Sequence, residues 1–203
     1  MDEKQMLFFD IERHLMNDDK PSGYINQIRD DARMREFPFS YLTRLEAVEQ
    51  SPVHHPEGNV WIHTMMVTDN AAARKDQSVD PHTLMWAALL HDIGKAVTTR
   101  VRNGRITAYD HDQEGERMAV EFLEECGQEE LFVKKVAALV RWHMQLLFII
   151  RNLPFAETDR MKREVPIREV ALLALCDRLG RTGDVDIAKE EENIRLFVKK
   201  YER

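Results

Sequence analysis

A histidine and an aspartate directly follow an apolar run near the middle of this chain. The run is LMWAALL (84–90), and His91 and Asp92 come next, in the string HDIGK. Such a run predicts a helix of the protein core, yet it ends in two ionisable groups. Buried charge is costly unless it is paired or coordinates a metal. Any fold of this chain must therefore supply a partner for this pair inside the protein.

The composition limits the architecture to one modest domain without disulfide bonds. The chain has 203 residues, enough for one domain or for one domain with an extension. Cys126 and Cys176 lie in apolar stretches, which indicates buried thiols in a reducing, cytoplasmic compartment. The formal net charge of −7 disfavours general binding of DNA or of an anionic membrane. We expect no membrane-spanning segment, because no stretch is long and apolar enough.

Apolar periodicity and breaker residues predict an all-α chain. We expect helices over residues 2–16, 38–50, 60–75, 81–92, 113–126, 129–150 and 167–179, and a last one that runs to Arg203. Asp80-Pro81 predicts a helix start, and Gly94 is placed to end that helix. Alternating residues around Asn103-Gly104 predict a small β-hairpin. Residues 154–166, bracketed by prolines, are expected to form a loop.

We expect two parts that pack as one globular unit. Residues 1–49 form an N-terminal helical extension, and residues 50–203 form the main domain. The first forty residues are weakly patterned, and a cap, a dimer arm and a packed extension all fit them. The sequence leaves the oligomeric state open.

Three more polar side chains lie on the apolar stripes of predicted helices, namely His63, His143 and Asp177. Taken singly, each is best explained as a core histidine or aspartate with an ordinary hydrogen-bond partner. Taken together with the His91-Asp92 pair, each would need its own buried hydrogen-bond partner. A metal ion shared by all of them is the simpler explanation. The remaining candidates fall in loops or on mixed helix faces and are assigned to the surface or to loops: His14, His54, His55 and His82.

The ligand set combines imidazoles and carboxylates and contains no thiolate. It favours iron, manganese, nickel, cobalt or zinc over calcium. A site of this kind with open coordination positions can activate water for attack on phosphorus. His111 is a further candidate, although a histidine just before a helix is also common without a metal.

The order of these residues resembles that of the HD-domain metal-dependent phosphohydrolase superfamily. Longer segments resemble the HD domain of bacterial CCA-adding tRNA nucleotidyltransferases: HHPEGNVWIHT (54–64), YDHDQEGERMA (109–119) and VALLALCDRLGRTGD (170–184). The similarity covers roughly residues 50–185 and implies an HD-domain helical bundle. Residues 1–49 are too few for a nucleotidyltransferase domain. We therefore expect a stand-alone HD domain that neither adds CCA nor binds tRNA as those enzymes do.

The resemblance also implies roles for individual residues. One divalent transition-metal ion would be held by four residues: His63, His91, Asp92 and Asp177. In two-metal members the HD aspartate bridges to a second ion, whose other ligands here would be His111 and His143. Asp92 would thus serve catalysis by orienting metal and water.

Lys95 would contact the substrate phosphate or the transition state, although a solvated lysine at a helix end is the plainer interpretation. Of Arg178 and Arg181, one is expected to hold phosphate, with a slight preference for Arg181. The hairpin arginines are expected to be solvated, with contact to an anionic substrate as the alternative: Arg100, Arg102 and Arg105.

These observations predict an enzyme, a phosphohydrolase that cleaves phosphate esters of nucleotides. Similarity suggests a 2',3'-cyclic phosphodiesterase acting on nucleotides or RNA ends, and a nucleoside monophosphate phosphatase is the alternative. A non-catalytic nucleotide or metal sensor would be expected to have lost ligands, and none is missing. A purely structural helical protein would leave the buried ionisable groups unexplained.

Overall fold

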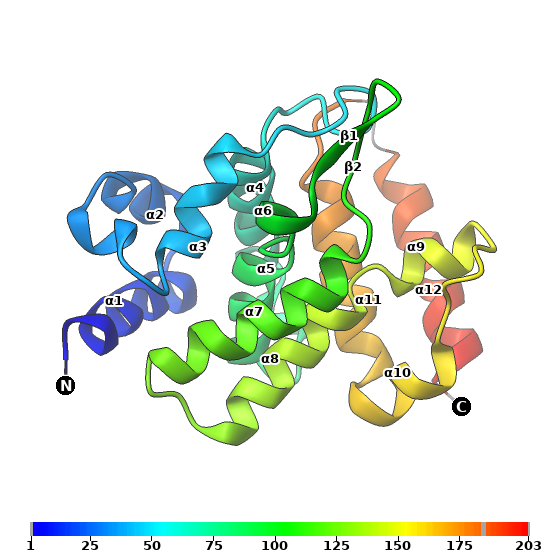
Figure 1. The fold of residues 1–203 in the computed structure, drawn as a ribbon. Coiled ribbons are helices and arrows are strands. Elements are labelled where there is room, and N and C mark those ends of the chain that lie inside the picture. The colour runs from blue at the N-terminus through cyan, green and yellow to red at the C-terminus, as the bar shows by residue number, and fades with distance from the viewer. Residues whose placement is uncertain (1, 184–185, 203) are drawn as a thin grey trace.

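The computed structural model describes residues 2–183 and 186–202, and it confirms the all-α prediction (Figure 1). The helices are α1 (Glu3–Asn17), α2 (Ser22–Ile28), α3 (Ser40–Thr43), α4 (Val60–Ala72), α5 (Pro81–Leu90), α6 (Lys95–Thr98), α7 (His111–Glu125), α8 (Glu130–Trp142), α9 (Gln145–Ile150), α10 (Thr158–Glu164), α11 (Ile167–Leu179) and α12 (Ile187–Tyr201). Short 3-10 helices lie at Ala32–Arg35, Arg44–Ala47 and Lys75–Gln77. The strands β1 (Arg100–Arg102) and β2 (Arg105–Thr107) form the predicted antiparallel hairpin.

Helix α5 lies at the centre of the bundle and packs against α1, α4, α8 and α11. Its residues 84–90 are all fully buried, as the apolar run predicts. The helix begins as expected, because the Asp80 side chain accepts a hydrogen bond from the Thr83 N–H at 3.2 Å and Pro81 occupies the first turn. Because α5 is central, His91 and Asp92, which directly follow it, are also buried in the interior.

The N-terminal segment packs on this core. Helix α1 buries one stripe, formed by Leu7, Phe8, Ile11 and Leu15. The Phe8 ring stacks on the Trp86 ring of α5 with centroids 4.1 Å apart. Of the three arrangements that suit this segment, the structure shows the packed extension.

Several element boundaries differ from the prediction. The single helix expected over residues 129–150 is two helices, α8 and α9, with His143 and Met144 between them. The helix expected over residues 38–50 is reduced to α3 and a 3-10 turn, and the expected loop at 154–166 contains α10. These boundaries lack a glycine or proline at the break itself, so local sequence does not mark them.

Gly94 does not end α5, which stops at Leu90. Gly94 has helical dihedral angles and precedes α6. A Cβ atom at this position would lie 2.1 Å from the His111 carbonyl oxygen. Glycine is therefore required here because the backbone of α7 approaches closely. No helix in the described part of the chain combines the length and apolarity that a membrane crossing needs.

Candidate metal centre

The six predicted ligands come from five segments that converge at one end of α5. His63 lies in α4, Asp177 lies in α11, and His91 and Asp92 follow the last turn of α5. His111 is the first residue of α7, and His143 directly follows α8. All six side chains are buried, with at most 7% of the residue surface exposed. The structure therefore brings together every residue that the sequence predicts as a ligand.

One group of ligand atoms surrounds Oδ2 of Asp92. The Nε2 atoms of His91 and His63 lie 3.2 and 3.7 Å from this oxygen. The Nε2 atom of His63 also lies 3.0 Å from Oδ1 of Asp177. These spacings suit several ligands that face one small cation.

A second group surrounds the other oxygen, Oδ1, of Asp92. The Nε2 atoms of His111 and His143 lie 3.4 and 3.8 Å from it, and 3.2 Å from each other. In both groups, three ligand atoms lie within 4.8 Å of one another. The two oxygens of Asp92 thus face different histidines, which is the arrangement that a carboxylate bridging two metal ions would need.

Three of the four histidines are oriented by carbonyl oxygens of their own turn. Nδ1 of His91 donates to the Ala88 carbonyl at 2.9 Å, Nδ1 of His111 to Ala108 at 2.7 Å, and Nδ1 of His143 to Val140 at 2.6 Å. A proton on Nδ1 leaves the lone pair on Nε2, which points into the centre. Metal-binding histidines are commonly held in this way.

His63 is oriented by different partners. Its Nδ1 atom lies 2.9 Å from Oε1 of Glu57 and 3.2 Å from the carbonyl oxygen of Gly180. The same Glu57 oxygen lies 2.8 Å from Nδ1 of His55. Only 1% of the Glu57 side chain is exposed, and its bonds to His63 and His55 lower the pKa of this carboxyl to about 2 although burial opposes them.

Glu57 and His55 are missing from the predicted site. His55 lies in a loop, as expected, but it is not a surface residue, because only 12% of its side chain is exposed and it lies against Glu57. Both residues lie in the loop that precedes α4, where apolar periodicity cannot predict which side chains are buried. The sequence could have indicated Glu57 only through the HHPEGNVWIHT segment, in which this carboxylate lies six residues before His63.

A cation would complete the environment of the ligand atoms. Nε2 of His63 and Nε2 of His91 are buried, and each faces a carboxylate oxygen, that of Asp177 at 3.0 Å and that of Asp92 at 3.2 Å. Burial lowers the pKa values of His111 and His143 to about 4, so both rings are neutral near pH 7. Their Nε2 lone pairs then face each other, a repulsive contact that a positive ion between them would relieve. The donor set therefore fits a transition metal.

The charges of the two aspartates agree with this interpretation. Burial opposes ionisation, but nearby Lys95 and His91 hold the pKa of Asp92 well below its usual range. Arg181 and His63 do the same for the pKa of Asp177. For His63, burial alone would lower the pKa, but its bonds to Asp177 and Glu57 raise it. A metal ion would displace the proton held on that ring.

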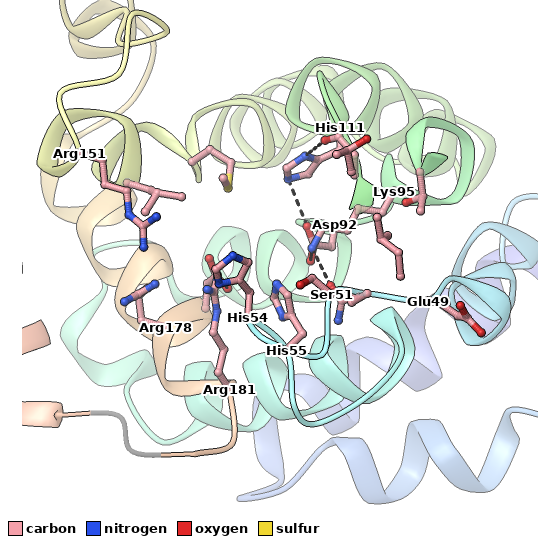
Figure 2. Close-up of a pocket in the computed structure, with 18 residues that line it drawn as sticks. Glu49, Ser51, His54, His55, Asp92, Lys95, His111, Arg151, Arg178 and Arg181 are labelled. Atoms are coloured by element: carbon pink, nitrogen blue, oxygen red, sulfur yellow. Dashed lines mark hydrogen bonds and ion pairs between the residues drawn. The ribbon is translucent and has the colours of Figure 1, made fainter. Parts of the chain in front are cut away.

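A cleft of about 230 Å³ opens above the ligands (Figure 2). Nζ of Lys95 lies in its wall, 2.7 Å from Oδ2 of Asp92 and 2.8 Å from Oε1 of Gln50. Arg178 and Arg181 lie on the other side of Asp92 in this view. Arg181 lies 3.4 Å from Asp177, whereas Arg178 forms an ion pair with Glu190 at 2.7 Å.

Other arginines near this cleft lack an acidic partner. No carboxylate oxygen among the described residues lies within 4.0 Å of a side-chain nitrogen of Arg100, Arg102, Arg105 or Arg151. Arg151 lines the cleft, and the other three belong to the hairpin beside it. In a chain of net charge −7, Arg151 thus adds positive charge to a cleft that Lys95, Arg178 and Arg181 also line, which makes the cleft attractive to anions.

Comparison with known proteins gives one consistent result. Residues 60–182 match the HD domain family. Multifunctional CCA protein of Pseudomonas fluorescens (strain SBW25) is 35% identical over 102 residues, which cover 50% of this chain and 24% of that protein. Multifunctional CCA protein of Halorhodospira halophila is 33% identical over 147 residues, which cover 68% of this chain and 34% of that protein. The chain thus spans about a third or less of these relatives' length. The match confirms the expected resemblance, and the chain belongs to the HD domain family.

Proposed function

We propose that this protein is a metal-dependent phosphohydrolase that cleaves phosphate esters of nucleotides. The observation that carries the proposal is the placement of Asp92, whose two oxygens face two groups of histidine Nε2 atoms beside a cleft lined by Lys95, Arg178 and Arg181. A sensor would require only ion or nucleotide binding. Here Asp92, His111 and Asp177 line one cleft together with Lys95, Arg178 and Arg181, and a phosphate can enter this cleft.

Two sets of residues would hold the metal. The first is His63, His91, Asp92 and Asp177, and the second is Asp92, His111 and His143. Iron, manganese, nickel, cobalt or zinc bound there would polarise the phosphoryl group and make a water molecule more acidic. The number of ions and their identity remain part of the proposal.

Lys95 and Arg181 are the residues best placed to bind the phosphoryl oxygens. The Lys95 ammonium is fixed between Asp92 and Gln50, so it can donate to an incoming oxygen without a large rearrangement. Arg181 lines the cleft and contacts Asp177 at a long 3.4 Å, so its guanidinium retains donors for a phosphoryl oxygen. Arg178 lines the same cleft but is engaged by Glu190, which supports the preference for Arg181.

The finer proposal is a 2',3'-cyclic phosphodiesterase that acts on nucleotides or RNA ends. It is supported by the sequence similarity to multifunctional CCA proteins across the ligand-bearing segments. The unpaired arginines of the hairpin also suit an RNA end, whose phosphates extend beyond the reacting one.

The direct test is hydrolysis of 2',3'-cyclic AMP by the purified chain supplied with manganese or nickel. Asp92→Ala should abolish turnover, and Lys95→Ala should lower kcat about 100-fold or more, as loss of a transition-state donor does. Lys135→Ala is a matched control, because Lys135 forms a comparable pair with Asp80 at 2.8 Å away from the cleft. Turnover of nucleoside monophosphates alone would favour the phosphatase. Metal and nucleotide binding without turnover of either substrate would favour the sensor.

A further inference from the structure

A second cavity adjoins the candidate metal centre. Its volume is about 560 Å³, within the range typical of small-molecule sites. It shares four lining residues with the metal cleft: Thr107, Ala108, His111 and Met144. A ligand bound at the centre could therefore extend past His111 into this cavity.

The wall of the cavity is mainly apolar and aromatic. It includes Tyr109, Phe148, Leu153, Pro154 and Phe155. The Phe148 and Phe155 rings lie 5.6 Å apart at 64°, and Phe155 is 57% exposed. Tyr109 at the rim is 59% exposed. Large aromatic side chains left exposed around a cavity are a recurrent sign of a binding site.

The charge of the cavity wall argues against a phosphate here. Arg141 is its one lining cation among the described residues, and it is fully engaged. It is bonded to Asp112, and to Glu157 at 2.8 Å. The available positive charge lies instead in the metal cleft, at Lys95 and Arg181. The two neighbouring spaces are therefore complementary, one suited to an anion and the other to a flat apolar group.

We propose that this cavity binds the nucleobase of the substrate whose phosphate lies at the metal centre. The inference rests on the proposed function and assigns a substrate-binding site to it. Aromatic side chains stack on bases of any identity, because every base has a π-face. Asp110 and Gln113 at the edge of the cavity provide polar groups for the rim of the base. Phosphate and base are thus bound on either side of His111.

Binding of nucleosides tests this proposal without any chemistry. Adenosine and uridine carry no phosphate, so saturation-transfer NMR with metal-free protein reports on the cavity alone. At least one of them should show stronger transfer to base protons than to ribose protons, and Phe155→Ala should reduce it. Phe9→Ala is a matched control, because Phe9 is 44% exposed on α1. Transfer to neither nucleoside, or equal loss in both variants, would overturn the proposal.

Kinetics separate this proposal from the proposed function. Glycerol 1,2-cyclic phosphate contains the five-membered cyclic ester of 2',3'-cyclic AMP but has no base. Phe155→Ala and Tyr109→Ala should lower kcat/KM for 2',3'-cyclic AMP about 5- to 100-fold, the range of one stacking contact, and leave the glycerol ester unchanged. An equal decrease for both substrates contradicts the base assignment. Nucleoside binding without hydrolysis of either ester refutes the cyclic phosphodiesterase and retains the cavity assignment.

Discussion

Replacing Glu57 by glutamine tests whether a loop carboxylate supports the metal centre. Glutamine keeps an oxygen that can accept from Nδ1 of His63, but it removes the negative charge that makes the ring a stronger ligand. Groups that orient metal ligands typically contribute about 10- to 100-fold to metal affinity. That range of affinities corresponds to about 1.4–2.8 kcal/mol in the free energy of metal binding.

The structure indicates where in that range each variant should fall. In Glu57→Gln the amide oxygen can still accept, so we expect affinity to fall about 10-fold. In Glu57→Ala the acceptor left for Nδ1 of His63 among the described residues is the Gly180 carbonyl, at 3.2 Å. We therefore expect a loss near the upper limit, about 100-fold. The ring of His63 remains in both variants, so the ligand itself is not removed.

The assay is competition for zinc between the metal-free protein and a chromophoric chelator. Glu169→Gln is the matched control, because Glu169 is also a buried carboxylate with two donors, Ser78 Oγ at 2.5 Å and the Val79 N–H at 3.0 Å. This control should lower stability and leave the zinc affinity unchanged. An unchanged affinity in Glu57→Ala would refute the argument, since the Gly180 carbonyl alone would then orient His63.

Three further predictions concern stability. Chelation should lower the unfolding midpoint by about 5–10 °C relative to protein with metal at 100 times its Kd, as measured by calorimetry, and an unchanged midpoint would contradict metal binding. Gly94→Ala should destabilise the fold by at least about 2 kcal/mol in urea titrations, because its Cβ would meet the His111 carbonyl. Gly23→Ala, which has open space, should be neutral or stabilising. Phe8→Ala should lower the free energy of unfolding by about 3–5 kcal/mol, and Phe9→Ala, at an exposed position, should lower it far less. Equally small effects of both substitutions would mean that residues 1–49 fold independently of the core.

The sequence was informative where a polar residue interrupts an apolar pattern. His63 and Asp177 lie on buried faces of α4 and α11, and His143 is buried directly after α8, so the apolar spacing correctly predicted that all three point inward. The HD pair follows a fully buried run, and the resemblance adds the position of His111. These signals depend only on local spacing, which helices preserve. Metal occupancy and the roles of these residues remain predictions.

What the sequence did not reveal depends on contacts between distant segments. Glu57 lies in a loop, where no apolar periodicity marks it. It supports the site only because α4 places the ring of His63 against its carboxylate. The break between α8 and α9 has no glycine or proline, and it lies where His143 turns back to the Val140 carbonyl. The aromatic cavity combines Tyr109, before α7, with Phe155, beyond α9. No local pattern relates these two positions.

The way the histidine rings are held has a consequence for the order in which the centre assembles. His91, His111 and His143 each bond to a carbonyl three residues earlier, so their orientation is available once each turn has formed. The support of His63 includes a carbonyl 117 residues away, beyond the end of α11. Asp92 and the two histidines around its Oδ1 atom lie in α7 or directly beyond the ends of α5 and α8. A chain in which α11 has not yet docked would therefore already hold a three-ligand site, and the docking of α11 would complete the other.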